Sequence, residues 1–147
     1  MTPTLTVARR YQSPYSRAVS ERNVDLVRSV YKQWNEKGVD TIGPRLADGV
    51  ELQDAPELPD AGTWRGRDTV LARLREVAEA VGGGWVDIQE VRPAGDKVVV
   101  SMVWHEQQAT GSPAFGDVFH LVQVDGDRIA RIRVFITFVD ALEAAAE

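Results

Sequence analysis

Apolar side chains in the first part of the chain recur at the three- and four-residue spacing of a helix. One such stripe follows Ser20, a residue type that caps helices, and runs to Gly38, where glycine favours a helix end. A short second helix is expected over residues 40–47. A third should start at Asp68 and end at the three glycines 82–84. The two long stripes consist of Val24, Val27, Tyr31 and Trp34, and of Val70, Leu71, Leu74, Val77, Ala78 and Val81.

Beyond residue 84 the pattern changes to the two-residue alternation of strands. Four strands are predicted, at residues 85–91, 97–108, 115–124 and 128–138, and the last pair is joined by an Asp-Gly hairpin signal. The C-terminal segment DALEAAAE should form a short helix or a tail. Helices followed by antiparallel strands predict an α+β fold, in which helices cover one face of a curved sheet and leave a cavity inside.

The chain divides into an arm and one domain. Residues 1–19 are polar, contain two prolines and show no usable period, so they are interpreted as a flexible N-terminal arm; docking on a partner is the alternative. Residues 20–147 form a single domain, with no internal repeat.

One carboxylate stands out in this pattern. Residues 50–54 alternate apolar and polar, which places Val50, Leu52 and Asp54 on the same inward face of a strand. A carboxylate at the end of an apolar face must be paired, altered in pKa, or exposed to a cavity. That is the environment of a general base. The loop that follows, residues 55–66, is rich in proline and glycine and should be structured.

Composition narrows the class of protein. Apolar content of 44% and charged content of 27% are those of a soluble globular domain. A net charge of −5 argues against a nucleic-acid surface, and no stretch is long and apolar enough to cross a membrane. The chain has no cysteine, so disulfide and thiolate chemistry are excluded. A cytoplasmic protein is the simplest interpretation.

Three segments carry a family resemblance: NVDLVRSVYKQWNEKG, LADGVELQDAPELPDAGTWRGRDTV and VDGDRIARIRVFITFVDALEAA. They resemble the nuclear transport factor 2-like superfamily, and most closely its SnoaL-like branch of polyketide cyclases and ketosteroid isomerase-like proteins. The resemblance implies a cystatin-like cone with three N-terminal helices packed on a curved, mostly antiparallel sheet.

The resemblance also implies roles for particular residues. Asp54 matches the position of the isomerase base, and Tyr31, seven residues before Gly38, matches the isomerase tyrosine. The position of the third isomerase group, an acid, falls on Phe119, and Asp117 lies near enough to substitute for it in part. Each residue also has a structural alternative. Asp54 could cap its loop or pair with Arg65 or Arg67, Tyr31 could be core packing, and Asp117 could belong to a turn.

The side chains expected to line the cone indicate the kind of ligand. They are mostly aromatic or aliphatic, and suit a flat, hydrophobic, oxygenated molecule of the polyketide or terpenoid type. The leading hypothesis is a cofactor-free enzyme of the isomerase, cyclase or lyase kind acting on such a carbonyl compound. The alternative is a non-catalytic ligand-binding or dimerisation module. No metal site is predicted. The expected lining residues are Trp34, Trp64, Met102, Trp104, Phe119, Ile132, Val134 and Ile136.

The outer face of the sheet is the expected partner surface. His105 and His120 are predicted to lie there, as satisfied interface histidines that could make a dimer sensitive to pH. Apolar residues on the same face favour a homodimer. These are Val98, Val118, Val122 and Val124.

Overall fold

The computed structural model describes residues 14–58, 60–80, 85–105 and 113–147. Six strands form one sheet in the order β2-β1-β6-β5-β4-β3, with neighbours antiparallel except for β1 and β6, which run parallel. The elements are helix α2 (Pro14–Lys37), the 3-10 helix η1 (Val39–Arg45), β1 (Leu46–Gln53), β2 (Thr63–Arg65), α3 (Arg67–Ala80), β3 (Trp85–Ala94), β4 (Lys97–His105), β5 (Pro113–Asp125), β6 (Arg128–Phe135) and α4 (Phe138–Ala145).

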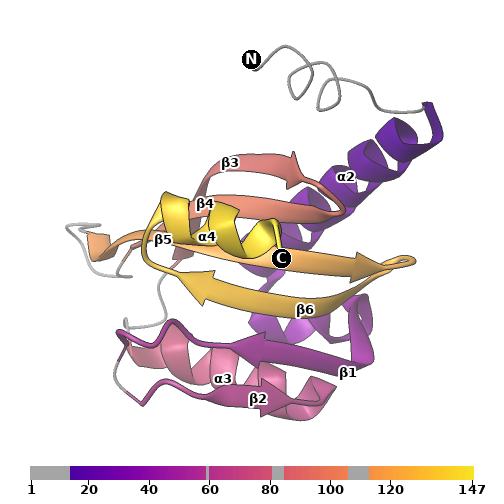
Figure 1. The fold of residues 1–147 in the computed structure, drawn as a ribbon. Coiled ribbons are helices and arrows are strands. Elements are labelled where there is room, and N and C mark those ends of the chain that lie inside the picture. The colour runs from indigo at the N-terminus through magenta and orange to yellow at the C-terminus, as the bar shows by residue number, and fades with distance from the viewer. Residues whose placement is uncertain (1–13, 59, 81–84, 106–112) are drawn as a thin grey trace.

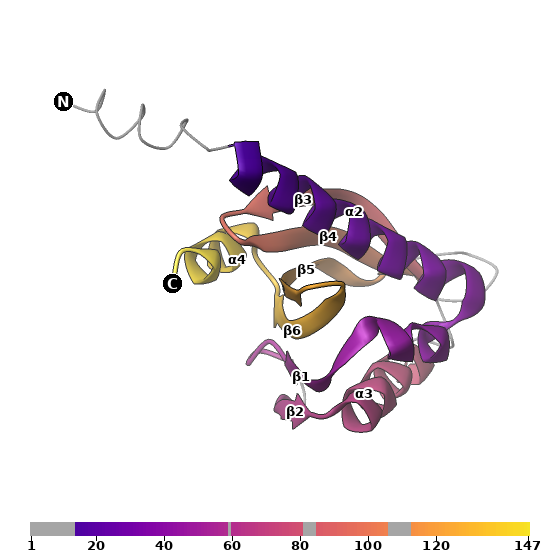
Figure 2. The same ribbon diagram turned by 90° about the vertical axis from the view of Figure 1, so that its right-hand side faces the viewer.

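The sheet has helices on both sides. Figure 1 shows α4 in front of the sheet, and the turned view of Figure 2 places α2 and α3 on the opposite side. Helix α2 packs on β3 and β4, and α3 packs on β1 and η1, whereas α4 contacts β5, β4 and β6. The larger core lies between the sheet and α2, η1 and α3, and a smaller one lies under α4. The expected α+β fold with a curved, mostly antiparallel sheet is therefore present.

The helices differ from the predicted arrangement of three at the N-terminus. Among the described residues only α2 and η1 precede the sheet, α3 follows β2, and α4 closes the chain. Helix α2 starts at Pro14, so Ser20 lies inside it rather than at its cap. Proline is well tolerated in the first turn of a helix, since its missing N–H would have had no partner there. The remainder of the predicted arm, residues 1–13, lies outside the described residues.

The segment between the first helix and the first strand also differs in detail. The expected helix at residues 40–47 is a 3-10 helix that ends at Arg45. Its proline, Pro44, has no N–H to give, and Gly43 is packed so closely that a Cβ there would lie 3.1 Å from Leu71 Cδ1. Strand β1 begins at Leu46, four residues before the predicted start at Val50. The short strand β2 lies inside the segment predicted as a loop.

The predicted outer face of the sheet is in fact its inner face at β5. Val118 and Val122 are buried in the larger core with Val98, and His120 between them is also buried. Phe119 instead packs beneath α4, with its ring 5.8 Å from that of Phe138. Both faces of β5 are covered, so apolar alternation along it could not tell inside from outside. Two predictions are therefore wrong: the valines of the predicted dimer surface are part of the core or pack against it, and Phe119 does not face the cavity.

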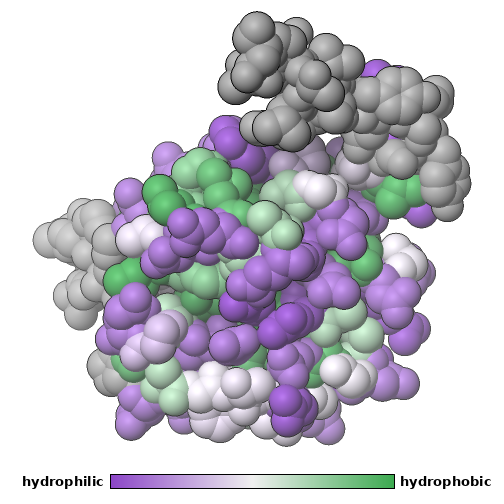
Figure 3. All heavy atoms as spheres, in the orientation of Figure 1, coloured by the Kyte–Doolittle hydropathy of each residue, from purple (hydrophilic) through white to green (hydrophobic). Residues whose placement is uncertain are grey.

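The exposed surface on the α4 side is mixed. Figure 3 shows apolar side chains among polar ones in the upper left of this face, where α4 crosses the sheet. In the part of the chain that the structure describes, the exposed large apolar side chains are Ile136, Val139 and Leu142, all at or beside α4. None of the helices in the described part of the chain is long and apolar enough to span a membrane.

Candidate active site

A cavity of about 420 Å³ lies between α3 and the inner face of the sheet. Most of its wall is apolar, and its polar side chains come from the end of β1 and from β5. They are two carboxylates, Asp54 and Asp117, and one imidazole, His120. The lining residues are Leu52, Asp54, Leu58, Leu74, Val77, Trp104, Asp117, Val118, His120, Val134 and Ile136.

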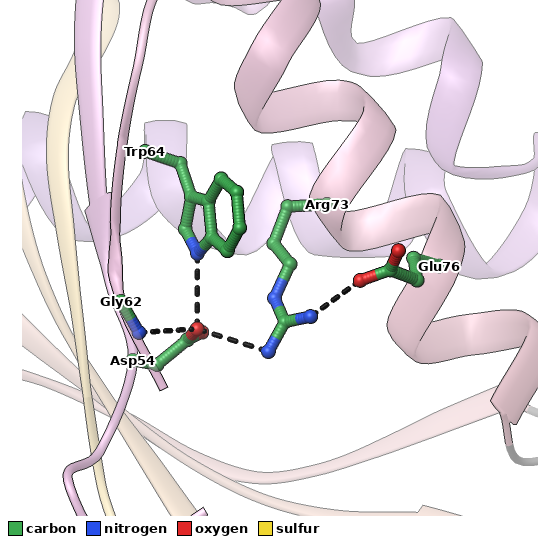
Figure 4. Close-up of polar contacts among 5 residues, drawn as sticks. All are labelled: Asp54, Gly62, Trp64, Arg73 and Glu76. Carbon is green, nitrogen blue, oxygen red and sulfur yellow. Dashed lines mark hydrogen bonds and ion pairs between the residues drawn. The ribbon is translucent and has the colours of Figure 1, made fainter. Parts of the chain in front are cut away.

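Asp54 follows directly after β1 and is 7% exposed. Its Oδ2 accepts three hydrogen bonds, from the Gly62 backbone N–H at 3.2 Å, from Trp64 Nε1 at 3.0 Å and from an Arg73 guanidinium nitrogen at 3.0 Å (Figure 4). Its other oxygen, Oδ1, accepts no hydrogen bond from the residues that the structure describes. The carboxylate is thus held in place through Oδ2, and Oδ1 is left available to contact a ligand.

Arg73 is the counter-ion of this carboxylate. It reaches from α3 with one guanidinium nitrogen on Asp54 and another on Glu76, and its guanidinium lies 5.1 Å from the centre of the Trp64 ring (Figure 4). Burial by itself would lower the pKa of Arg73, but the carboxylates of Glu76 and Asp54 together raise it above its ordinary value. The guanidinium therefore stays charged and compensates the buried charge of Asp54.

His120 lines the same cavity, and its ring is hydrogen-bonded to Tyr31. The Tyr31 hydroxyl and His120 Nδ1 are 2.6 Å apart, and both residues are almost completely buried. Burial lowers the pKa of His120 to about 4, although the charge of Asp54 acts in the opposite direction. Burial also raises the pKa of Tyr31 above its ordinary value. Both groups are therefore neutral at pH 7.

The contact between these two neutral groups fixes the tautomer of the imidazole. If Nδ1 carried the ring proton, the buried Tyr31 O–H would have no acceptor among the described residues, so we assign the phenol as the donor, Nδ1 as the acceptor and the ring proton to Nε2. His120 then has an N–H donor on the side of the ring away from Tyr31. Two aromatic contacts stabilise this arrangement. Tyr31 stacks on Trp34 with ring centroids 5.7 Å apart, and Trp34 packs edge to face with Trp104 with ring centroids 5.5 Å apart.

The site residues expected from the sequence fall into three groups. Five line the cavity: Asp54, Asp117, Trp104, Val134 and Ile136. Five others lie next to it without being part of its wall: Tyr31, Trp34, Met102 and Ile132 in the larger core, and Trp64 on Asp54. Phe119 alone is on the other face of the sheet.

The partners of Asp54 and the place of His120 were not predicted. Arg65 and Arg67, the expected partners, pair instead with Glu51 and Asp48. Arg73 points from a position outside the apolar stripe of its helix, so helical periodicity gave no reason to place it near Asp54. His105 stands outside the cavity wall, 3.7 Å from Asp87, and therefore does not form the expected pair with His120. No group of three or more His, Asp or Glu side chains in the described residues is arranged to hold a metal.

The family model for the SnoaL-like domain matches residues 27–132, which is more than half of the chain. The chain belongs to the SnoaL-like family. No functionally curated protein matches it. The match includes α2 from Val27 onward, both sides of the cavity, Asp54 and His120.

Solved structures of other proteins share the SnoaL-like fold at low sequence identity. A protein from a soil-derived mobile gene cassette is 16% identical, with a TM-score of 0.70 over 88% of this chain and 99% of its own. A Jannaschia protein described as a SnoaL-like polyketide cyclase is 18% identical, with a TM-score of 0.66 over 92% and 96%. TerC, co-crystallised with polyporic acid, is 19% identical, with a TM-score of 0.64 over 86% and 99%. These likenesses concern the fold.

Proposed function

We propose that this protein is a cofactor-free acid–base enzyme of the isomerase, cyclase or lyase kind that acts on a hydrophobic carbonyl compound. The observation that carries the proposal is that Asp54 and His120, both buried, line the same apolar cavity, Asp54 from the residue after β1 and His120 from β5. One is a carboxylate with a free oxygen, and the other is a neutral imidazole. Proton abstraction beside a carbonyl needs this combination of a base and a hydrogen-bond donor.

In this mechanism Asp54 and His120 act on neighbouring atoms of the substrate. Asp54 Oδ1 takes a proton from the carbon next to the carbonyl, and His120 donates its Nε2–H to the carbonyl oxygen as negative charge develops there. A neutral imidazole is able to polarise a carbonyl in this way. The enolate then takes the proton back on another carbon, attacks a second carbonyl, or expels a leaving group. These outcomes correspond to an isomerase, a cyclase and a lyase.

Tyr31 takes a supporting role in this proposal. Its hydroxyl is used by His120 Nδ1, and it is not part of the cavity wall. We therefore assign Tyr31 as a positioning residue, which fixes the tautomer and the orientation of His120, in place of the direct donor expected from the sequence. Asp117 is exposed, so it lacks the apolar surroundings that a neutral second donor would need.

The nature of the cavity wall suggests the substrate class. Aliphatic and aromatic side chains make up most of it, and a volume of about 420 Å³ can accept a molecule of several fused rings. One structural neighbour, described as a SnoaL-like polyketide cyclase, supports a polyketide-like compound.

Deuterium exchange tests the chemistry whichever product the enzyme forms. A panel of hydrophobic aromatic ketones and 1,3-dicarbonyl compounds is incubated with the protein in D2O, and label at the carbon beside the carbonyl is followed by NMR. We expect Asp54→Asn to slow the exchange of an accepted compound by about 10²–10⁴-fold. Asp48→Asn, at an exposed ion pair with Arg67, is the matched control. An Asp54→Asn variant that exchanges as fast as the unaltered protein would rule out Asp54 as the base.

A non-catalytic ligand-binding module is the second candidate. The observation in its favour is the triple hydrogen bonding of Asp54 Oδ2, which ties the carboxylate into the junction of β1, β2 and α3. The same experiment separates the two candidates, because a binding module would bind members of the panel without exchanging their protons.

We keep the homodimer and the cytoplasmic location as proposals. The valines predicted to form the dimer surface lie in the larger core or pack against it. Among the described residues the exposed large apolar side chains are at or beside α4, and we propose these as the dimer surface: Ile136, Val139 and Leu142. Sedimentation of the unaltered protein and of Val139→Glu at micromolar concentration tests this: the charge should turn a dimer into a monomer.

A further inference from the structure

Asp117 differs from the other polar groups of the cavity. It lines the cavity but is exposed, whereas Asp54 and His120 are buried. It makes no hydrogen bond or ion pair with any residue that the structure describes, while Asp54 is neutralised by Arg73. Asp117 is therefore the uncompensated charge of this site, and it lies where the cavity meets solvent.

Asp117 stands at the end of the regular part of the β4–β5 pairing. Both Asp117 and His120 line the cavity from β5, three residues apart. The pairing of β5 with β4 is regular from His120 to Asp117 and becomes irregular beyond Asp117, between the pairs Val103–Asp117 and His105–Pro113. Asp117 therefore lies where the regular ladder ends, at the edge of the cavity wall.

The rest of the wall adds no positive charge. Apart from Asp54, Asp117 and His120, the lining side chains are all aliphatic or aromatic, and none is a lysine or an arginine. His120 is neutral at pH 7, because burial lowers its pKa to about 4. A ligand entering the cavity therefore passes a carboxylate and meets no cation that could bind an acidic group.

We propose that Asp117 is a specificity-determining residue that excludes anionic ligands and favours neutral or cationic ones. The inference rests on the cavity being the ligand site of the proposed function and narrows its substrate class. Acids, phosphates and sulfates are disfavoured, and hydrophobic carbonyl compounds that are uncharged or bear an amine are favoured.

Three probes that share one ring system and differ in charge test this inference: 2-naphthoate, 2-naphthamide and 2-naphthylmethylammonium. Their dissociation constants are measured with the full chain in low salt, and binding in the cavity is read from the NMR shifts of the Val118 and Val134 methyl groups. Asp117→Asn removes the charge, and Asp117→Lys reverses it. Asp125→Asn, at the opposite end of β5 and also exposed, removes one charge from the protein without touching the cavity.

We expect Asp117→Asn to tighten naphthoate binding and to weaken ammonium binding, each by about 3- to 5-fold, with the amide unchanged. Asp117→Lys should invert the order of the two charged probes, and about 0.5 M NaCl should reduce all of these differences. The proposal is overturned if Asp117→Asn changes the three affinities no more than Asp125→Asn does. It is also overturned if none of the probes shifts the cavity methyl signals. Neither result depends on proton transfer by Asp54, which the exchange experiment tests separately.

Discussion

The hydroxyl of Tyr31 and the imidazole of His120 meet at 2.6 Å although 89 residues separate them in the sequence. The contact joins α2 to β5 across the larger core, and neither residue has appreciable contact with solvent. Each is a polar group that would be costly to bury alone, and each satisfies the other. The pair thus allows a donor to stand in an apolar cavity.

Removing the Tyr31 hydroxyl should expose the cost of this burial. Tyr31→Phe keeps the stacking on Trp34 but leaves His120 Nδ1 without its donor, so we expect a loss of about 1–3 kcal/mol in the free energy of unfolding. The ¹⁵N shifts of the imidazole should also report a mixture of tautomers in place of the Nε2–H form. Unchanged ring-nitrogen shifts in Tyr31→Phe would contradict the assigned direction of the hydrogen bond.

The lowered pKa of His120 predicts a dependence of stability on pH. The group binds its proton at about 4 in the folded chain and near 6.5 in the unfolded chain, so the unfolded state holds more protons between these values. Stability from neutral His120 is therefore complete above pH 6.5 and lost as the pH falls towards 4. The free energy of unfolding should fall by about 1.4 kcal/mol per pH unit in that window from this group.

Urea denaturation at several pH values measures this slope. We expect His120→Gln to lose it and His105→Gln, the other histidine, to retain it. Tyr31 from α2 and Asp54 from β1 are the polar groups that act on His120, so an NMR titration in Asp54→Asn should move its pKa further down. Equal slopes in the two histidine variants would show that the buried imidazole is not the group responsible.

Much of the fold was accessible from the sequence, because helical and strand periodicity each depend on one buried face. Asp54 could be placed inward for that reason, since Val50 and Leu52 define the face it shares. The inward face of β5 could not be predicted in this way, because both of its faces are covered: Phe119 lies under α4 and His120 under α2. Periodicity then gives no direction, and the choice depends on which face of the sheet helix α4 covers, which is a matter of tertiary structure.

The polar partners of the candidate site were less predictable for a different reason. Arg73 and Asp54 are 19 residues apart and on different elements, and three other arginines were near enough in sequence to compete. Which of them reaches Asp54 depends on how α3 crosses β1. The parallel pairing of β1 with β6, which sets the position of Asp54 relative to β5, likewise depends on tertiary structure.

Arg73 provides a test of how far Asp54 depends on its counter-ion. Arg73→Met leaves a buried carboxylate with two neutral donors, and we expect a loss of about 3 kcal/mol in the free energy of unfolding. Arg73→Lys should lose less, since it keeps the charge but not the two-pronged contact with Asp54 and Glu76.

A second arginine on α3 is the control for this measurement. Arg75 pairs with Asp40 on the surface, and Arg75→Met should change stability little because that pair is open to solvent. Chemical denaturation of the three variants at pH 7 makes the comparison. If Arg73→Met is no less stable than Arg75→Met, the Arg73–Asp54 pair does not stabilise the junction of β1 and α3.

Asn35 supports a different part of the molecule, the edge of the sheet at β3. Its side chain accepts a hydrogen bond from Val86 N–H at 3.1 Å and donates one to Val86 C=O at 2.6 Å, so it occupies the place of a neighbouring strand. An open strand edge can pair with another chain, and proteins commonly block such edges.

We expect Asn35→Leu to lower the free energy of unfolding by about 1–2 kcal/mol and to increase aggregation on heating. Asn35→Asp can accept from the Val86 N–H but cannot donate to the Val86 C=O. Its free energy of unfolding should therefore lie between those of the unaltered protein and Asn35→Leu. Light scattering and the hydrogen exchange of Val86 measure these effects, and an Asn35→Leu variant with unchanged exchange at Val86 would show that the side chain does not protect this edge.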